Sequence, residues 1–511
     1  MSRKTGVVLS YALMIFDVLS TLLLTPFIIR TLGQAEYGVY KLVFALNAYL
    51  LLLDLGVGNA TIRYIAKYKV EQNRDKERQF LAVATMFYAA VALLAVIIGC
   101  VLVFLFPTVF AKGLSQEEIR LGQLLLGITM VNSAITLGTS AYNNILIAYE
   151  KFAVSRVASM VQTIARMALT YAALVVGWGS VGIVVVNLLM TALCRGFFVI
   201  YVLGVIKLKP LFRGIEFSFI KDIVAYSSLV LLQMIATQLN ATVDQILIGS
   251  LVEASAIILA VYGVGTQIVQ YFQSIGSAFT GVLMPGVVKL VEGKASSAQL
   301  TDEMVKVGRL VFMVLSLIWC GFLVNGREFI ILWAGAENAQ AYGVAAILMT
   351  AYLFILTESI GTQILWALNQ HREQTILKTV IVLSNIALTI LLIQWKPLLG
   401  ATIGTFLSLM LGDVLVMNLI FRKKLSICLA DYYKRLFQGI IPCLMIALVA
   451  GLLVRRLIPV GWIWLCLKIF IMVSVYGAAM LWFGMTQYEK GLFYSIIRKL
   501  KIDNHKKDTS L

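Results

Sequence analysis

The stretch LLDLGVGNATIRYIAKY, residues 52–68, is the most informative part of the sequence about the fold. It begins as apolar sequence of the kind that crosses a bilayer, yet it carries one carboxylate, Asp54. Two glycines, Gly56 and Gly58, follow, and the stretch ends in a basic segment. An ionised side chain inside a bilayer costs about 2.5–3.5 kcal/mol on insertion scales, so it persists where it faces a cavity or a partner. We therefore expect a membrane protein with a polar interior.

The composition of the whole chain indicates the same class. Of its 511 residues 60% are hydrophobic and only 13% are charged, whereas soluble domains carry about a quarter of charged residues. Apolar runs of about 20 residues, the length that crosses a hydrocarbon core, recur from end to end, and a β-barrel would show shorter alternating segments. We expect an all-α polytopic protein with about fourteen spans: 7–30, 38–62, 80–106, 121–147, 154–177, 180–206, 222–249, 256–288, 307–325, 341–369, 374–394, 398–421, 438–455 and 461–484.

Basic segments divide these spans into two six-helix lobes with a pseudo-twofold relation and a closing pair. Two-lobe transporters place the substrate between such bundles. The predicted parts are an N-terminal lobe 1–206, a basic linker 207–221, a C-terminal lobe 222–421, an amphipathic segment 422–437, a helix pair 438–484 and a basic tail 485–511.

The net charge of +17 reflects topology in this interpretation. With the N-terminus inside, the inner segments hold 30 Lys and Arg residues and the outer segments hold 7, which predicts that both termini are cytoplasmic. Nucleic-acid binding would need an exposed basic module, and none is recognisable. We expect a multi-pass protein of the bacterial plasma membrane.

The motifs of soluble enzymes and of metal sites are missing from the sequence. The six cysteines are scattered, and no CxxC or Cys/His pairing occurs. There is no P-loop, GxSxG or HExxH. We expect no enzyme activity, no metal and no cofactor, and a function that resides in the membrane part.

Polar residues in several spans recur every three or four positions, so each set lies on one helix face. Such stripes either hydrogen-bond neighbouring helices or line a wet cavity, and their number across both lobes favours the cavity. They occur at Asp17/Thr21/Thr25, Asn132/Thr136/Thr139/Asn143, Ser159/Thr163/Arg166/Thr170, Asn187/Thr191/Arg195, Gln233/Thr237/Asn240/Asp244 and Gln267/Gln270/Ser274/Ser277.

The embedded charges suggest an anion site in the N-terminal lobe, because desolvated guanidinium groups bind phosphate oxygens in bidentate fashion. The candidate substrate-binding residues are Arg166, Arg195, Arg63, Arg30, Lys41, Asn187, Gln233 and Asn240. The candidates for cation coupling or ion pairing are Asp17, Asp54, Asp244 and Glu358. Pairing of Arg166 or Arg195 with Asp17 or Asp54 remains open.

Three segments carry a family resemblance: TPFIIRTLGQAEYGVYKL (25–42), the stretch 52–68, and ILIAYEKFAVSR (145–156). The chain resembles the polysaccharide-transporter branch of the multidrug/oligosaccharidyl-lipid/polysaccharide (MOP) flippase superfamily. This resemblance implies export of undecaprenyl-diphosphate-linked oligosaccharides by alternating access, with the diphosphate near Arg30, Arg63, Arg166 and Arg195. The implied partners are the lipid-linked oligosaccharide, membrane lipids and glycan polymerase or export machinery.

Other functions stay open at this point. In the peptidoglycan-precursor (lipid II) branch a tight cluster of cavity arginines lies in the first two spans, whereas here Arg30 and Arg63 lie at predicted span ends. Asp17 and Asp54 would suit a cation-coupled multidrug antiporter. A scaffold without transport activity, serving a glycan-polymerising complex, is the third alternative.

Overall fold

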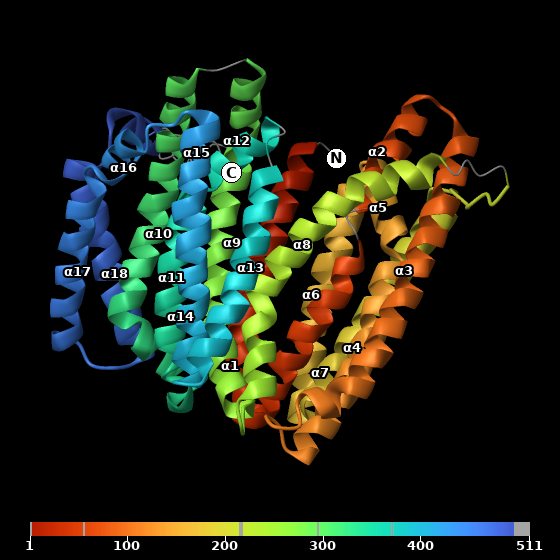
Figure 1. Ribbon diagram of the computed structural model, residues 1–511, viewed down its shortest axis with the longest axis horizontal. Helices are drawn as coiled ribbons and strands as arrows, with labels where there is room; N and C mark the ends of the chain where they lie inside the picture. The colour runs from red at the N-terminus through yellow and green to blue at the C-terminus, as the bar shows by residue number, and fades with distance from the viewer. Residues whose placement is uncertain are drawn as a thin grey trace, which may run out of the picture. The chain divides into compact units, whose positions relative to one another are not determined.

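The computed structural model describes residues 3–54, 57–213, 218–293, 296–368, 370 and 372–494, and within them it is helical, with no strand (Figure 1). The α-helices are α1 (Arg3–Leu51), α2 (Val57–Val70), α3 (Arg74–Val109), α4 (Gln116–Gly138), α5 (Ser140–Ala148), α6 (Phe152–Val175), α7 (Gly179–Ile200), α8 (Ser218–Leu251), α9 (Ala256–Glu292), α10 (Ser297–Ala334), α11 (Ala341–Thr357), α12 (Ser359–Ala367), α13 (Arg372–Ile393), α14 (Pro397–Leu409), α15 (Met417–Leu425), α16 (Leu429–Phe437), α17 (Ile440–Leu457) and α18 (Trp462–Ala479). The shorter turns are η1 (Leu52–Asp54), η2 (Tyr201–Val205), η3 (Ala336–Asn338), η4 (Met410–Val416) and η5 (Met480–Gly484). The all-α prediction is confirmed.

The lengths of the helices agree with a multi-pass membrane protein. Among the described residues 11 helices are long and apolar enough to cross a bilayer, or up to 12 if the bent pair α11–α12 is one span. This count treats α1 as one span and leaves out α8, which has 34 residues. Dividing α1 in two and adding α8 makes the structure consistent with the predicted fourteen.

The contacts between helices divide the chain into two compact units. The first comprises Met1–Val264 and Lys378–Ser408, and the second comprises Gly265–Leu377 and Leu409–Leu511. This division assigns α8, α14 and most of α13 to the first unit, so it does not follow the predicted lobe boundaries, and the two six-helix lobes stay a prediction. The predicted tail 485–511 lies outside the described residues from residue 495 onward.

Breaks in the backbone divide the first 70 residues. Within α1, Gly33 has a positive φ of 74°, a conformation that costs glycine little, and it separates two helical stretches where two spans are predicted. The predicted span 38–62 is itself interrupted, because η1 ends at Asp54 and α2 begins at Val57. Asp54 therefore lies at a helix junction and not within a continuous helix.

Glycine allows α1 to approach α9 closely. A Cβ atom at Gly38 would lie 1.8 Å from the carbonyl oxygen of Ala256, whereas one at Gly127 in α4 would meet nothing within 4 Å. We expect Gly38→Ala to cost about 1–3 kcal/mol, because the helices must move apart. Gly127→Ala should stabilise α4 by up to about 1 kcal/mol through helix propensity. Thermal unfolding in detergent tests the pair, and equal midpoints for the two variants would contradict this account of the packing.

In the first unit the basic linker is fastened to the start of α3. The Arg74 guanidinium donates to the Ile206 carbonyl oxygen at 2.7 Å. The Arg78 Nε donates to the Lys209 carbonyl oxygen at 3.2 Å, and the Leu211 N–H donates to the Arg78 carbonyl oxygen at 3.0 Å. The main chain at the described start of the predicted linker is therefore held by hydrogen bonds from two arginine side chains and from one backbone N–H.

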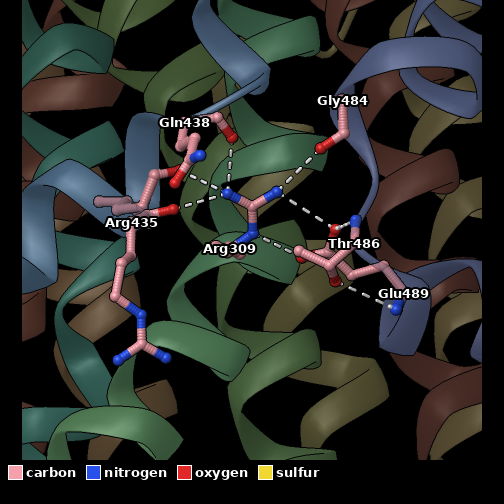
Figure 2. Close-up of polar contacts among 7 residues, drawn as sticks. Arg309, Arg435, Gln438, Gly484, Thr486 and Glu489 are labelled. Carbon is pink, nitrogen blue, oxygen red and sulfur yellow. Dashed lines mark hydrogen bonds and ion pairs between the residues drawn. The ribbon is translucent and has the colours of Figure 1, made fainter.

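In the second unit a buried arginine fastens the closing helices α17 and α18 to α10. Figure 2 shows the Arg309 guanidinium surrounded by oxygen acceptors. Its Nε donates to Glu489 Oε1 at 2.6 Å, and the two side chains are only 5% and 3% exposed. Its other N–H groups donate to main-chain carbonyls 2.6–3.3 Å away, those of Arg435, Leu436, Gln438 and Gly484.

A second buried ion pair joins α18 to α10 nearer the C-terminal end of α10. Lys468 Nζ lies 2.7 Å from Glu328 Oε2, and these side chains are 2% and 9% exposed. The Gly461 N–H also donates to Glu328, at 3.3 Å, and Arg455 donates to the Val324 carbonyl oxygen at 3.0 Å. The two ion pairs, at Arg309 and Glu328 of α10, make the closing helices an integral part of the second unit.

Candidate functional site

A polar cavity lies within the first unit between α1, α6 and α7. It has a volume of about 200 Å³, which corresponds to about seven water molecules in the liquid. Arg166 and Asn187, both predicted site residues, contribute to its wall. Its lining is Ser20, Thr21, Leu24, Thr25, Ile28, Tyr40, Phe44, Thr163, Arg166, Met167, Thr170, Ile183 and Asn187. Arg166 is the only charged residue of this lining.

Arg166 is not neutralised by a carboxylate. Among the described residues no acidic side chain lies within 4 Å of its guanidinium, whereas Asp17 accepts a hydrogen bond from the Thr163 hydroxyl at 2.9 Å. The residues that share a helix face with Arg166 at steps of three and four, Thr163 and Thr170, face the same cavity. The cavity therefore combines a guanidinium group that has no carboxylate within 4 Å in the described part of the chain with hydroxyl and amide groups, a combination that suits an anion.

Arg195 occupies a different place from Arg166. It follows Asn187 by eight residues on α7, about 12 Å along the helix axis, and it does not line the cavity. Asp54 is its electrostatic neighbour, although no ion pair within 4 Å joins these two described residues. The structure thus brings Arg195 and Asp54 into one neighbourhood and Arg166 into another.

The remaining predicted cations also lie outside the cavity lining. Arg30 on α1 and Arg63 on α2 have exposed side chains. Lys41 lies against Gly263 of α9, with its Cγ 2.8 Å from the position of a Cβ there, and 5.5 Å from the centre of the Tyr37 ring. The side chain of Gln233 lies outside the described residues. Of the predicted cations, Arg166 alone faces this cavity.

A second polar site in the first unit, the Asp244 cluster, is built from α8, α9, α13 and α14. Asp244 is 2% exposed. It accepts hydrogen bonds from Tyr262 at 2.5 Å, from Thr389 at 3.0 Å and from Thr405. The cluster, completed by two buried amides, consists of Asp244, Asn240, Tyr262, Asn385, Thr389 and Thr405.

The Asp244 cluster holds a carboxylate without a cationic partner. Within the described residues no Lys or Arg lies within 4 Å of Asp244, and every group that contacts it is an uncharged oxygen donor. Asn385 links the predicted site residue Asn240 to this shell through a hydrogen bond of 3.0 Å. A single buried carboxylate ringed by neutral oxygens is the ligand chemistry of a hard monovalent cation or of a proton.

Glu358 belongs to the second unit, at the junction of α11 and α12. It is 3% exposed, and the Tyr433 hydroxyl donates to one of its carboxylate oxygens. Asn418 donates to the other at 3.0 Å. It therefore takes no part in either polar site of the first unit.

Some residues of these sites are not among the predicted ones. Tyr40 lines the cavity, although no polar periodicity marks it in segment 25–42. Asn385 and Thr389 do show a signal, an i, i+4 polar pair within a predicted span. Thr405 and Tyr433 are joined to their partners only by tertiary contacts.

Solved structures similar to this chain are transporters. The lipid II flippase MurJ in an inward closed conformation superimposes with a TM-score of 0.73 at 15% identity, over 96% of this chain and 99% of that chain. An inward-facing multidrug resistance MATE family transporter of the MOP superfamily gives 0.61 at 15%, over 80% and 94%. A MOP superfamily transporter from Pyrococcus furiosus, described as having a binding pocket of reverse polarity, gives 0.52 at 18%, over 82% and 96%. These identities establish the fold alone.

The sequence comparison identifies the family. No curated protein matches the chain. The family model described as polysaccharide biosynthesis protein matches residues 4–291, more than half of the chain. This is a multi-pass membrane protein with the fold of MOP superfamily transporters, and it belongs to the polysaccharide biosynthesis protein family.

Proposed function

We propose that this protein is a flippase that moves undecaprenyl-diphosphate-linked oligosaccharides across the bacterial plasma membrane, for the synthesis of a cell-surface polysaccharide. The observation that carries the proposal is Arg166, an arginine that faces a polar cavity in a membrane helix bundle and has no carboxylate within 4 Å among the described residues. The family match and the flippase fold support it. In this proposal the phosphate oxygens accept hydrogen bonds from Arg166, and Asn187 and the threonine hydroxyls complete their shell.

The size of the cavity limits which part of the substrate it receives. A volume of about 200 Å³ matches a phosphate group and not a complete oligosaccharide. The lipid tail remains in the bilayer, and the sugars need a passage that opens during alternating access. The positive-inside rule assigns the end of the bundle with Arg63 and the linker to the cytoplasm, where the lipid-linked sugars are assembled.

In this proposal the Asp244 cluster couples translocation to an ion gradient. It binds the coupling cation, Na⁺ or a proton, because a buried carboxylate without a positive partner is stabilised by taking one up. The sequence contains no nucleotide-binding motif, so a cation gradient or the membrane potential replaces ATP.

The test of the function is a comparison of three outcomes in cells that lack the gene. Accumulation of diphosphate-linked oligosaccharides on the inner leaflet, reversed by the intact gene, supports the flippase. Resistance to cationic dyes that depends on Asp17 would instead indicate a multidrug antiporter. Loss of cell-wall precursor export would indicate a lipid II flippase, and normal polymer export by the Arg166→Ala/Arg195→Ala variant would indicate a scaffold.

Coupling gives a separate prediction. We expect Asp244→Asn to reduce gradient-driven translocation at least about tenfold, because the amide removes the charge that attracts the cation. Translocation in proteoliposomes, with Na⁺ and proton gradients imposed in turn, measures this and identifies the ion. Asp75→Asn, the same change at an exposed carboxylate of α3, is the matched control and should leave the rate unchanged. A normal gradient dependence in Asp244→Asn would refute the assignment.

A further inference from the structure

Thr163 on α6 connects the polar cavity to a carboxylate on α1. It belongs to the cavity lining and is 7% exposed. Its hydroxyl donates to Asp17 Oδ1 at 2.9 Å. Asp17 is not part of the lining, but Ser20 and Thr21, three and four residues further along α1, are. The carboxylate is therefore a direct neighbour of the cavity wall, and a hydroxyl of that wall is bonded to it.

The hydroxyl of Thr163 has to choose between acceptors. A threonine hydroxyl has a single hydrogen, so it donates to one acceptor at a time. While Thr163 donates to Asp17, the oxygen atom has only lone pairs left for other groups. The oxygens of an ionised phosphate are acceptors as well, and they gain nothing from those lone pairs. Asp17 and a phosphate in the cavity are thus rival acceptors for one O–H.

Two other threonines of the lining donate to the main chain of their own helix. Thr21 Oγ1 donates to the Asp17 carbonyl oxygen at 2.8 Å, and Thr25 Oγ1 donates to the Thr21 carbonyl oxygen at 2.7 Å. Such acceptors stay within reach as long as the helix is intact. Thr163 differs from both, because its acceptor is a side chain on a neighbouring helix. Of these three hydroxyls, that of Thr163 is the one whose bond a ligand exchanges most readily.

The position of Arg166 makes this exchange relevant to the phosphate site. Arg166 follows Thr163 by three residues, and both side chains lie on the face of α6 that lines the cavity. A phosphate that accepts from Arg166 therefore lies within about one helical turn of the Thr163 hydroxyl.

We infer that Asp17 competes with the bound phosphate for the hydroxyl hydrogen of Thr163 and thereby limits how tightly the cavity holds the lipid-linked substrate, an inference that rests on the proposed function. When a phosphate binds to Arg166, the Thr163 hydroxyl turns to a phosphate oxygen and gives up its bond to Asp17. The free energy of the lost bond offsets that of the new one. The substrate is consequently held more weakly than it would be if Thr163 had no other acceptor.

This competition favours release, which a transporter needs because a ligand that binds too tightly leaves slowly. When the Thr163 hydroxyl returns to Asp17, the phosphate loses one donor and leaves more readily. Asp17 is a positioning residue in this account, because it acts on the substrate through Thr163.

A double-mutant cycle on binding tests the inference, with the full chain in lipid nanodiscs and undecaprenyl diphosphate as the probe. Asp17→Ala should lower the dissociation constant at least about tenfold, since Thr163 then donates to the phosphate without a rival. Thr163→Val should raise the constant at most about threefold in the wild type but at least about tenfold in Asp17→Ala. In Asp17→Asn the amide oxygen still accepts from Thr163 but carries no charge, so its constant should lie between those of the wild type and Asp17→Ala.

Translocation in proteoliposomes gives a second readout. Asp17→Ala should lower both the half-saturating substrate concentration and the maximal rate, because the substrate is held more tightly and released more slowly. Damage to the structure alone would lower the maximal rate without tightening the binding.

The matched control is Thr25→Val, the same change at a lining threonine whose hydroxyl donates to its own helix. It should change the dissociation constant by the same factor in the wild type and in Asp17→Ala. The inference is overturned if Asp17→Ala binds no more tightly than the wild type, if Thr163→Val acts by equal factors in both backgrounds, or if no variant binds the probe. Should Asp17→Ala fail to fold, Asp17→Asn that binds no more tightly than the wild type decides against the inference.

Failure of the proposed function would give a different result. Arg166→Ala that binds undecaprenyl diphosphate as tightly as the wild type would show that this cavity is not the phosphate site. Loss of binding in Arg166→Ala, together with equal factors for Thr163→Val in both backgrounds, would leave the phosphate site standing and remove only the role of Asp17.

Discussion

Replacement of Arg166 by alanine is expected to reduce translocation of the lipid-linked oligosaccharide by about 30-fold to 4,000-fold. Truncating one partner of a desolvated charge pair costs about 2–5 kcal/mol, and each 1.4 kcal/mol is a factor of ten. Arg166 is the only charged residue of the cavity lining, so no second cation takes over its role there. Rates of sugar protection from an external glycosidase in proteoliposomes measure the effect.

Two further variants show whether the loss of translocation in Arg166→Ala comes from the lost guanidinium geometry or only from the lost positive charge. Arg166→Lys keeps the charge but not the bidentate geometry, so it should retain more activity than alanine and less than arginine. Arg63→Ala, at an exposed position outside the cavity, is the control for loss of charge alone and should change the rate at most a few-fold. If Arg63→Ala were as damaging as Arg166→Ala, the phosphate site would not be this cavity.

Replacement of Glu489 by glutamine is expected to destabilise the second unit by about 3–5 kcal/mol, because it leaves the Arg309 charge buried without its counter-ion. Both side chains are almost fully buried, and their N–O distance is 2.6 Å. Unfolding in mixed micelles with rising SDS measures the free energy. Glu373→Gln breaks a partly exposed pair with Lys424 and should cost less than about 1 kcal/mol.

Removing both charges should restore only part of this stability. A hydrophobic replacement of a buried ion pair is often neutral, but Arg309 also donates to main-chain carbonyls of α16 and of the segment after α18. In Arg309→Met/Glu489→Met these carbonyls lose their donor, so we expect the double variant to lie between Glu489→Gln and the wild type. A double variant as stable as the wild type would show that these carbonyls need no protein donor.

Local features of the sequence predicted much of the helical architecture and one wall of the cavity. Apolar run length is a property of each span alone, so the spans could be predicted without knowledge of their neighbours. The i, i+4 spacing likewise places Thr21, Thr25 and Arg166 on helix faces that meet at one cavity. Such predictions hold where a side chain's direction follows from its own helix.

Predictions that depended on tertiary contacts could not be made in this way. Arg30 and Arg63 were grouped with Arg166 because all three are cations. The backbone breaks at Gly33 and at η1, which change the direction of the helices that carry Arg30 and Arg63, could not be predicted from charge. The contact between Glu358 and Tyr433 joins residues 75 positions apart, and no periodicity links them. Arg309 and Glu489 are separated by 180 positions. Each lies in a segment that was predicted to be a basic cytoplasmic segment, so no signal in the sequence indicated a buried ion pair.

The two ion pairs on α10 have a consequence for how this kind of protein can change its length over evolution. A descendant that lost everything after residue 438 would keep Arg309 and Glu328 on α10 without their partners Glu489 and Lys468. We therefore expect deletion of the last two helices to be accompanied by replacement of both Arg309 and Glu328, because each would otherwise be left without its counter-ion. Among relatives that have shed the pair, neutral residues should occupy the places of Arg309 and Glu328.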